Sequence, residues 1–382
     1  MKILFVVNYY YPYISGVSEY LRLLAEEMVK RGHDVKVLAS NHDHLKSHEI
    51  INGVKVYRAP IICKISKGTV SPAFIFKART MAQNADIVNL HLPMLESSII
   101  SLLIRKNKLF TTYQCDLTMP PNLLNKFIMK VMDTSNKICL KRSQKIAVLS
   151  IDYAKHTRFT YKYKNKLVEI SPPIKDYSRT IVPLFQHHDN EKIIGFCGRI
   201  VEEKGLDILL KAFKKISKDN DRLVLKIAGD YESVAGGSIY EDLMNLIRKE
   251  KITNVEFLGK LSEKDMEKFY SSLDVFVLPS TNPTEAFGMV QVEAMYCGAP
   301  VVASDLYGVR MIAKNTGMGV VVEKNNVDSL ANGLLSVLNS PKKYIKSKEE
   351  IKQIYGTERC ALDYEKFFRE IIEKNEKSNT DN

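Results

Sequence analysis

Two series of short β-rich runs alternate with helical segments along this chain, and no other feature of the sequence constrains the fold as strongly. The first series occupies residues 2–8, 35–39, 54–58, 87–90, 109–112 and 146–149. The second occupies residues 192–196, 223–228, 255–258, 275–278, 300–303 and 320–322. Strands that alternate with helices pair in parallel beneath a helical cover. The sequence therefore predicts an α/β protein with two parallel sheets.

A break between the two series marks the predicted domain boundary. Residues 171–189 show no periodicity and include three prolines. A chain of 382 residues exceeds one ordinary core and suits two α/β domains. We therefore expect an N-terminal Rossmann-like domain over residues 1–185 and a second Rossmann-like domain over residues 186–355. Residues 356–382 are expected to form a closing helix, followed by a disordered tail from residue 374.

Positive charge is concentrated in the first half of the chain. The net charge is +12, but residues 1–185 carry 28 Lys and Arg against 13 Asp and Glu, whereas residues 186–382 carry 28 against 31. A field of one sign favours anionic lipid, a polyanion or nucleic acid. The sequence contains no recognisable motif of a nucleic-acid-binding module, so we expect no nucleic-acid partner.

Residues 126–141 can form a helix with two distinct sides. At 100° per residue its lysines fall within roughly 60° of one another: Lys126, Lys130, Lys137 and Lys141. A separate apolar arc holds Phe127, Ile128, Val131, Met132, Ile138 and Cys139. Such a helix could lie on an anionic membrane, although an ordinary domain helix with a solvated lysine face is the commoner case. With the charge asymmetry, this segment favours a lipid-linked acceptor and peripheral membrane contact.

The sequence shows neither a secretory signal nor a membrane span. The apolar run at residues 3–7 is too short for a signal-peptide core, and no stretch approaches the ~20 apolar residues that cross a bilayer. We therefore expect a cytoplasmic protein.

The six cysteines of the chain include no C-x-x-C pair, which favours reduced core residues over a zinc site or disulfides.

Glycines and charged residues follow the predicted strands of the second half. Ligands of open parallel sheets bind at the carboxyl ends of the strands. The residues that follow the first three strands of this half are Gly198, Arg199, Lys204, Asp230 and Gly259. The densest segment, residues 279–290, follows the fourth strand and leads into a helix that carries Glu293. This edge of the second sheet is therefore the predicted ligand site.

The residue types at this edge suit a diphosphate. Gly288, at a helix start, lets backbone N–H groups approach phosphate oxygens, whose charge the helix dipole favours. Arg199 can bind a diphosphate through two N–H groups and Lys204 supplies a point charge, so leaving-group charge can be stabilised without a metal. The carboxylates of Glu285 and Glu293 can accept hydrogen bonds from sugar or ribose hydroxyls.

Two features limit this interpretation. Arg199 and Lys204 could instead pair with Glu202 and Glu203 in a surface cluster. The only D-x-D segment, residues 219–221, precedes its strand and is expected at the opposite edge of the sheet, so we interpret it as a solvated turn. We therefore expect no metal site and no cofactor.

The run from Glu285 to Ser304, EAFGMVQVEAMYCGAPVVAS, with Gly198-Arg199 and Lys204-Gly205 upstream, resembles the large retaining family 4 of glycosyltransferases. The resemblance covers nearly the whole chain and implies a GT-B fold, whose two parallel sheets face each other across a cleft. It also implies that Glu285 contacts donor-sugar hydroxyls, that Glu293 holds the ribose, and that Arg199 and Lys204 bind the diphosphate.

The same resemblance gives the full set of candidate residues. The catalytic candidates are Glu285, Arg199 and Lys204. The donor-binding candidates are Gly198, Arg199, Lys204, Asp230, Gly259, Glu285, Phe287, Gly288, Met289, Val290 and Glu293.

The N-terminal half matches the family less completely. Gly16 lies in the loop after the first strand, but Ser15 occupies a position where a second glycine is usual. Gln114 stands where the family usually has a histidine, and a glutamine cannot act as a general base. In the family's proposed same-face route the leaving phosphate takes the acceptor proton, so Gln114 need only hydrogen-bond. His91 is a further candidate for the acceptor side, or a structural residue at a strand end.

The leading function is transfer of a hexose, with retention, from a UDP- or GDP-sugar to a glycolipid, a polysaccharide precursor or another acceptor hydroxyl. A sugar-nucleotide epimerase on a similar fold is one alternative. A non-catalytic sugar-nucleotide-binding partner subunit is another, motivated by Gln114 and Ser15.

Overall fold

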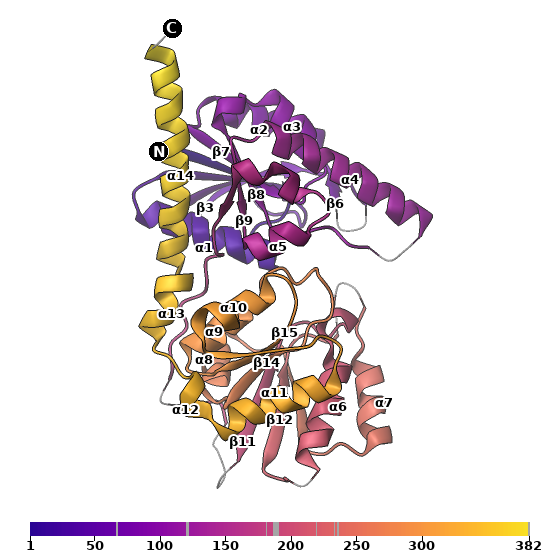
Figure 1. The fold of residues 1–382 in the computed structure, drawn as a ribbon. Coiled ribbons are helices and arrows are strands. Elements are labelled where there is room, and N and C mark those ends of the chain that lie inside the picture. Colours follow the sequence, from indigo (N-terminus) through magenta and orange to yellow (C-terminus); the bar gives the residue numbers. More distant parts are fainter. Residues whose placement is uncertain are drawn as a thin grey trace. The chain divides into compact units, whose positions relative to one another are not determined.

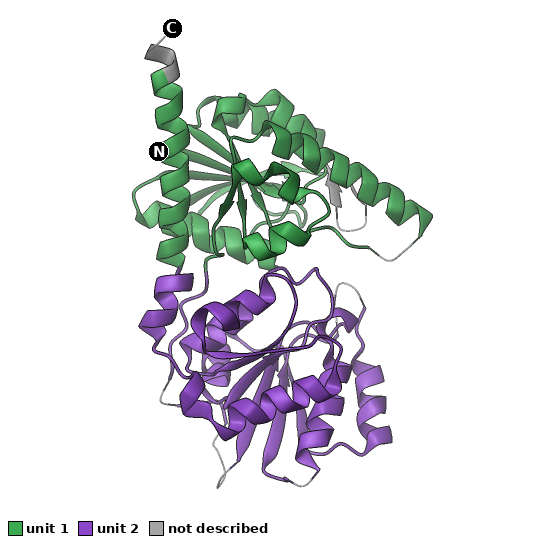
Figure 2. Ribbon diagram, viewed as in Figure 1, with its two compact units in different colours: residues 1–173, 357–382 green, residues 174–356 purple. Residues whose placement is uncertain are grey.

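The computed structural model of the chain consists of two α/β units (Figures 1 and 2). It describes residues 1–382 except 66–67, 120–121, 181, 186–190, 219, 233, 235–236 and 381–382. Unit 1 comprises Met1–Pro173 and Thr357–Asn382, and unit 2 comprises Ile174–Gly356. Each unit has its own largely parallel sheet, so the predicted architecture is confirmed.

Eight strands form the main sheet of unit 1, in the order β10-β9-β8-β7-β1-β2-β4-β3. Their bounds are β1 (Lys2–Val6), β2 (Asp34–Asn41), β3 (His48–Ile51), β4 (Val54–Pro60), β7 (Ile87–Leu92), β8 (Leu109–Tyr113), β9 (Lys145–Val148) and β10 (Leu167–Glu169). Only β3 runs antiparallel to its neighbour. The sequence did not indicate β3, β10 or the hairpin of β5 (Cys63–Ile65) and β6 (Gly68–Val70), because runs of three or four residues are too short to show a period.

Helices cover both faces of this sheet. On one face lie α2 (Pro72–Gln83), α3 (Ser97–Leu103) and α4 (Leu123–Arg142), whose side chains join Leu4 and Val6 of β1 in one buried cluster. On the other lie α1 (Gly16–Lys30) and α14 (Thr357–Thr380), where the Phe368 ring packs 5.0 Å from that of Phe110. The short helices α5 (Ile151–His156), η1 (Lys106–Lys108) and η2 (Thr160–Lys166) complete the unit.

The C-terminal helix therefore belongs to the N-terminal unit. The hydroxyl of Tyr364 on α14 lies 2.8 Å from the Tyr20 hydroxyl and 2.8 Å from Thr112 Oγ1. The expectation of a disordered tail from residue 374 is wrong as far as residue 380, because α14 continues to Thr380 and Asn375 Nδ2 donates to Asn107 O at 2.8 Å.

The boundary between the units also differs from the predicted one at residue 185. Residues 174–185 group with unit 2, where Leu184 N donates to Ser272 Oγ at 2.9 Å and Lys175 forms an ion pair with Glu263. The segment before residue 186 lacks periodicity because it packs on unit 2 without forming a helix or strand.

The expectation that all cysteines lie in the core is wrong for Cys63, which is exposed.

Unit 2 has a six-stranded, all-parallel sheet in the order β13-β12-β11-β14-β15-β16. Its strands are β11 (Lys192–Cys197), β12 (Leu223–Ala228), β13 (Val255–Gly259), β14 (Val275–Leu278), β15 (Val301–Ser304) and β16 (Gly319–Val322). Its helices are η3 (Glu202–Lys204), α6 (Leu206–Ser217), α7 (Tyr240–Glu250), α8 (Glu263–Ser271), α9 (Met289–Tyr296), α10 (Val309–Thr316), α11 (Val327–Asn339), α12 (Pro341–Tyr344) and α13 (Lys348–Tyr355).

The strand order reverses between β11 and β14 in unit 2, and between β1 and β7 in unit 1. Such reversal points leave an opening at the carboxyl ends of the strands, where open α/β sheets bind their ligands. In each unit, the segments that follow these two strands are therefore expected to form a ligand site.

Candidate functional site

The backbone loops that follow β11, β12 and β13 are in direct contact. Gly198 N donates to Ala228 O at 3.0 Å, and Gly229 N donates to Gly259 O at 2.8 Å. A Cβ atom on Gly229 would lie 1.8 Å from Gly198 O, so this position has no room for a side chain. The contact holds the candidate residues Gly198, which follows β11, and Gly259, which ends β13, at one edge of the sheet.

Lys204 and Glu285 form an ion pair at the reversal point of unit 2. Lys204 ends η3, directly after β11, and Glu285 lies in the loop after β14. Their side chains are only 15% and 19% exposed. The two loops are joined by a hydrogen bond from Thr281 N to Glu203 O at 2.9 Å. The structure thus brings together two candidates that are distant in sequence.

Gly205 makes this close approach possible. It has φ +67°, which glycine adopts without the cost that other residues incur. A Cβ atom there would lie 2.3 Å from Pro279 O. The glycine therefore fixes η3 against the loop after β14, which positions Lys204.

Arg199 adopts the surface pairing that the sequence left open. Its Nη2 lies 2.7 Å from Glu203 Oε1, and its side chain is exposed. Lys204, by contrast, does not pair with Glu202 or Glu203 in an ion pair but with Glu285. The surface-cluster alternative therefore describes Arg199 and not Lys204.

Glu293 lies on α9 and accepts a hydrogen bond of 2.9 Å from the hydroxyl of Tyr270, which belongs to α8. Burial, with the nearby Glu293 charge, raises the pKa of Tyr270 well above its usual value, so the phenol stays protonated and donates. The sequence did not single out Tyr270, because an aromatic residue in an amphipathic helix usually signals core packing.

The segment Phe287–Val290 forms the start of α9. Gly288 is its N-cap with φ +82°, and Met289 and Val290 are half-buried in its first turn. Phe287 is buried, with its ring 5.6 Å from that of Tyr355. The free N–H groups of a helix start are suited to an anion, as the family resemblance implies for the donor-binding candidates Gly288, Met289 and Val290.

The loops after β12 and β13 carry the remaining candidates and two residues that sequence reasoning missed. Asp230 Oδ1 accepts from Glu232 N at 3.0 Å, which shapes its turn. Beside Gly259, the rings of Tyr231 and Tyr240 stack with their centroids 4.3 Å apart. Both tyrosines are half-buried; Tyr231 lies in a glycine-rich stretch that carries no periodic signal, and Tyr240 is the first residue of α7.

In unit 1, His91 and Gln114 form a buried pair. His91 is the last residue but one of β7, Gln114 directly follows β8, and Gln114 Nε2 lies 3.1 Å from His91 Nδ1. Burial lowers the pKa of His91 from 6.5 to about 3, so the imidazole is neutral. With 2% of its surface exposed, His91 fits the structural alternative better than an acceptor contact.

This buried imidazole should make stability fall in mild acid. Its pKa is lower in the folded than in the unfolded chain, so below pH 6.5 the unfolded state takes up a proton that the folded state does not. Lowering the pH from 7 to 5 should therefore cost the wild type about 2 kcal/mol more than a His91→Gln variant. Urea unfolding of both proteins at each pH measures this, and equal losses would contradict it.

The loop after β1 is organised by Ser15. Its hydroxyl accepts from Ser18 N at 3.2 Å, and Ser18 Oγ accepts from Ser15 N at 2.8 Å, so the two form a capping box at the start of α1. Gly16, the first residue of the helix, is exposed. Ser15, which stands where a glycine is usual, thus caps the start of α1.

At the reversal point of unit 1, Asn8 Nδ2 donates to Glu96 Oε2 at 3.3 Å. Glu96 is 6% exposed, and its burial raises its pKa. No sequence signal pointed to this carboxyl group, because it lies three residues beyond Pro93 in a segment without a motif.

Within the described part of the chain, no group of three or more His, Cys, Asp or Glu side chains is arranged to hold a metal ion. Asp219 of the D-x-D segment lies outside the described residues. No described helix is both long enough and apolar enough to pass through a bilayer.

Two family models match this chain. The model for Glycosyltransferase Family 4 matches residues 14–177, and the model for Glycosyl transferases group 1 matches residues 180–354. Together the matches span most of both units. The chain belongs to this family of glycosyltransferases and has the GT-B fold.

Individual relatives agree with this assignment. An uncharacterized glycosyltransferase of Methanocaldococcus jannaschii is 26% identical over 97% of this chain and 99% of its own length. A phosphatidyl-myo-inositol mannosyltransferase of Mycolicibacterium smegmatis is 26% identical over 88% of this chain and 85% of its own. The crystal structure of Anabaena HepE, in complex with UDP and glucose, shares the fold with a TM-score of 0.73 at 17% identity, over 97% of this chain and all of that one.

Proposed function

We propose that this chain is a retaining, metal-independent hexosyltransferase whose donor is a UDP- or GDP-sugar. The observation that carries the proposal is the Lys204–Glu285 ion pair at the reversal point of unit 2, beside the helix start at Gly288. A cation next to free backbone N–H groups suits the donor diphosphate, and a carboxylate next to that cation suits the hydroxyls of the attached sugar.

Each candidate residue has a distinct part in this reaction. Lys204 and Arg199 stabilise the charge that builds up on the leaving diphosphate, which is the task a metal would otherwise perform. Glu285 orients the sugar, and Glu293 accepts from the ribose. The leaving phosphate accepts the proton of the acceptor hydroxyl, so no general base is needed at Gln114.

The proposed acceptor is a glycolipid or a polysaccharide precursor. The chain itself is proposed to be a cytoplasmic protein that contacts the membrane peripherally. The basic first half of the chain and the lysine row of α4 support this acceptor class. One relative's name specifies phosphatidyl-myo-inositol, a lipid. Flotation with vesicles of phosphatidylglycerol and phosphatidylcholine tests the membrane contact, and binding that is absent at low salt would reject it.

A thermal-shift series tests the donor site. UDP, GDP, ADP and their common sugar conjugates are added in EDTA, because a ligand that binds the folded state raises its stability. A shift with one nucleotide class supports the site, its base preference and its independence of metal. NMR of the product then gives the anomeric configuration, and product formation without an acceptor would favour an epimerase.

Glu293→Ala should weaken nucleotide binding by about 10- to 100-fold, because a hydrogen bond to a charged group contributes roughly 1.5–3 kcal/mol. Isothermal titration with the preferred nucleotide measures the change. Glu250→Ala is the control, since Glu250 ends α7 and pairs there with Lys214. Equal affinities for both variants would remove Glu293 from the site.

A further inference from the structure

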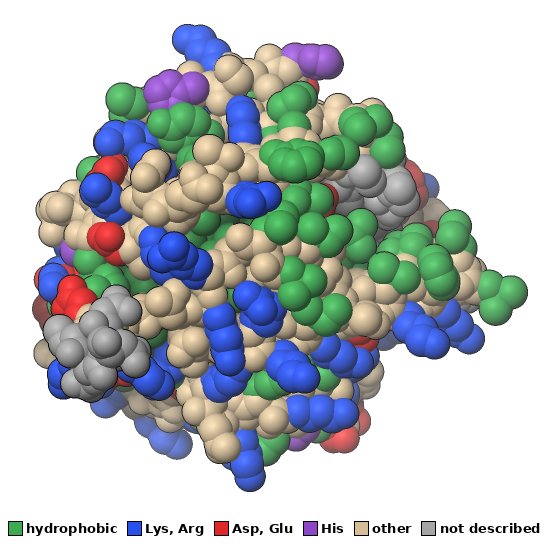
Figure 3. Space-filling view, turned by 90° about the horizontal axis from the view of Figure 1, so that it is seen from above, with side chains coloured by type: hydrophobic (Ala, Val, Ile, Leu, Met, Phe, Trp, Pro, Cys, Tyr) green, Lys and Arg blue, Asp and Glu red, His purple; other side chains and the backbone are tan. Residues whose placement is uncertain are grey.

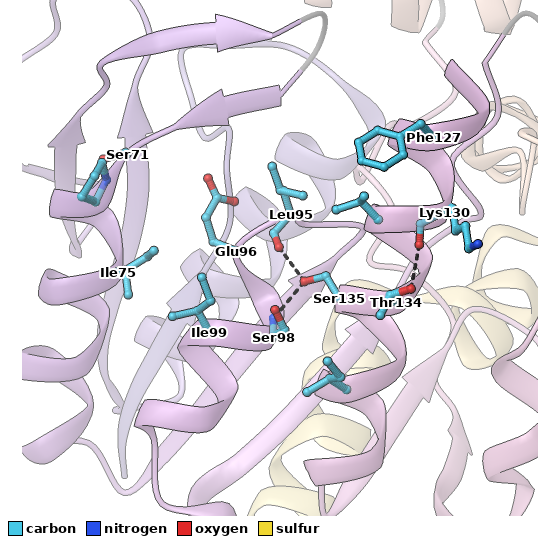
Figure 4. Close-up of a pocket in the computed structure, with 13 residues that line it drawn as sticks. Ser71, Ile75, Leu95, Glu96, Ser98, Ile99, Phe127, Lys130, Thr134 and Ser135 are labelled. Carbon is cyan, nitrogen blue, oxygen red and sulfur yellow. Dashed lines mark hydrogen bonds between the residues drawn. The ribbon is translucent and has the colours of Figure 1, made fainter. Parts of the chain in front are cut away.

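Unit 1 contains a cavity of about 600 Å³ between α2, α3 and α4. Its apolar lining includes Ile75, Leu95, Ile99, Phe127, Val131 and Ile138. Figure 4 shows Ser71 and Ile75 of the α2 side opposite Phe127 and Thr134 of α4, with Ile99 of α3 between them. A volume of this size with an apolar lining is typical of small-molecule sites.

The cavity opens onto an exposed apolar surface. Phe127 is 66% exposed and Ile99 is 49% exposed, although both also line the cavity. Leu102 of α3 and Leu124 of α4 extend this surface. Figure 3 shows hydrophobic side chains gathered on this face, with Lys and Arg side chains beside them. A continuous exposed apolar patch marks an interaction site rather than an ordinary surface.

The orientation of α4 explains why this surface is exposed. Its buried residues are Ser135, Asn136, Cys139 and Leu140, so polar and small side chains form much of the face toward the sheet. At 100° per residue, the row of Phe127, Val131 and Ile138 points away from that face. The apolar arc of this helix is therefore only partly buried.

A row of lysines lies next to the apolar row. Lys126, Lys130, Lys137 and Lys141 are all exposed. Lys130 also lines the cavity. An apolar opening bordered by lysines is complementary to an amphiphile that has a hydrocarbon chain and an anionic headgroup.

The charge at the other side of the cavity sets the direction of such a ligand. Glu96 is the only carboxyl group among the described residues that line it. Because a carboxylate repels an anion, the headgroup belongs at the Lys130 end and the chain extends across Ile99 toward Ile75.

We propose that this cavity binds the hydrocarbon chain of an anionic membrane lipid, with the headgroup beside Lys130. This assignment gives unit 1 a lipid-chain site distinct from the nucleotide site of unit 2. As the binding site of a lipid-linked acceptor it rests on the proposed function.

The test uses 11-(dansylamino)undecanoic acid, an anionic single-chain probe whose emission shifts to the blue in an apolar site. The wild type is expected to bind it saturably. Val131→Phe, which fills the cavity, should weaken binding at least about tenfold. Leu123→Phe, which adds the same ring on the exposed part of α4 outside the cavity, should leave the affinity unchanged.

The charge is tested with a second pair of variants. Lys130→Glu should weaken binding of the acid, but not of the corresponding uncharged amide. Lys162→Glu changes the net charge equally, on η2, and should have little effect. Loss of the Lys130 effect at high salt would agree with an ionic contact.

Three results would overturn the proposal: no saturable blue-shifted emission, equal affinities of Val131→Phe and Leu123→Phe, or a dimer in sedimentation velocity that Phe127→Ser abolishes. The last would identify the surface as an interface between two copies of the chain. Nucleotide thermal shifts of the same variants report on unit 2 alone, so failure of the donor site and failure of the lipid-chain site are distinguishable.

Discussion

Replacing Lys204 with alanine is expected to lower kcat by about 10²–10³, the usual loss when one preorganised group that stabilises transition-state charge is removed. The Lys204 side chain is largely shielded from water, and a charge that is shielded in this way is screened less than an exposed one. In the proposed reaction the charge of the diphosphate grows as the sugar leaves, so the loss should fall mainly on kcat rather than on donor affinity. Steady-state release of the nucleotide measures it.

Two variants separate catalysis from damage to the site. Lys204→Ala leaves Glu285 without its ion-pair partner, so the double variant with Glu285→Gln shows how much of the loss comes from that carboxylate. Lys211→Ala removes an exposed lysine of α6 that pairs with Asp207, and should keep normal turnover. A near-normal kcat for Lys204→Ala would contradict the proposal that Lys204 stabilises the charge of the leaving diphosphate.

The sequence was sufficient to predict the sheets because each main strand is an uninterrupted β-rich run between helical segments. The same reasoning failed where the signal is short or absent. The four residues of β3 carry no period. The segment around Leu184 packs on unit 2 through its own backbone N–H group, which carries no sequence signal. The helical tail beyond residue 374 is polar, so its composition resembles that of a disordered segment.

The candidate site shows a similar division. Lys204 and Glu285 could each be identified from their motifs, but they are 81 positions apart, and their pairing depends on how two loops meet. Tyr270 and Glu96 belong to no motif, and only the fold brings them to Glu293 and Asn8. The residue types therefore predict what each side chain of the site can bind, whereas the side chain it pairs with depends on the strand order and on how the loops meet.

The close contact of the loops at Gly198 and Gly229 leads to the second large effect. Gly229→Ala should lower the stability of unit 2 by about 3 kcal/mol, because backbone atoms must move to admit a Cβ atom that would lie 1.8 Å from Gly198 O. For a unit of this size the melting temperature should fall by roughly 6–12 °C. Calorimetry measures the change.

Gly317→Ala is the matched control, since Gly317 also has a positive φ, +65°, but nothing lies within 4 Å of the position that its Cβ atom would take. It should cost only the roughly 1–2 kcal/mol of a left-handed backbone. The two variants also separate stability from function. Gly229→Ala displaces the loop that carries Gly198, so it should lose the nucleotide-induced thermal shift, whereas Gly317→Ala should keep it. Equal melting temperatures would mean that these loops adjust freely, and a site built on their contact could not be preorganised.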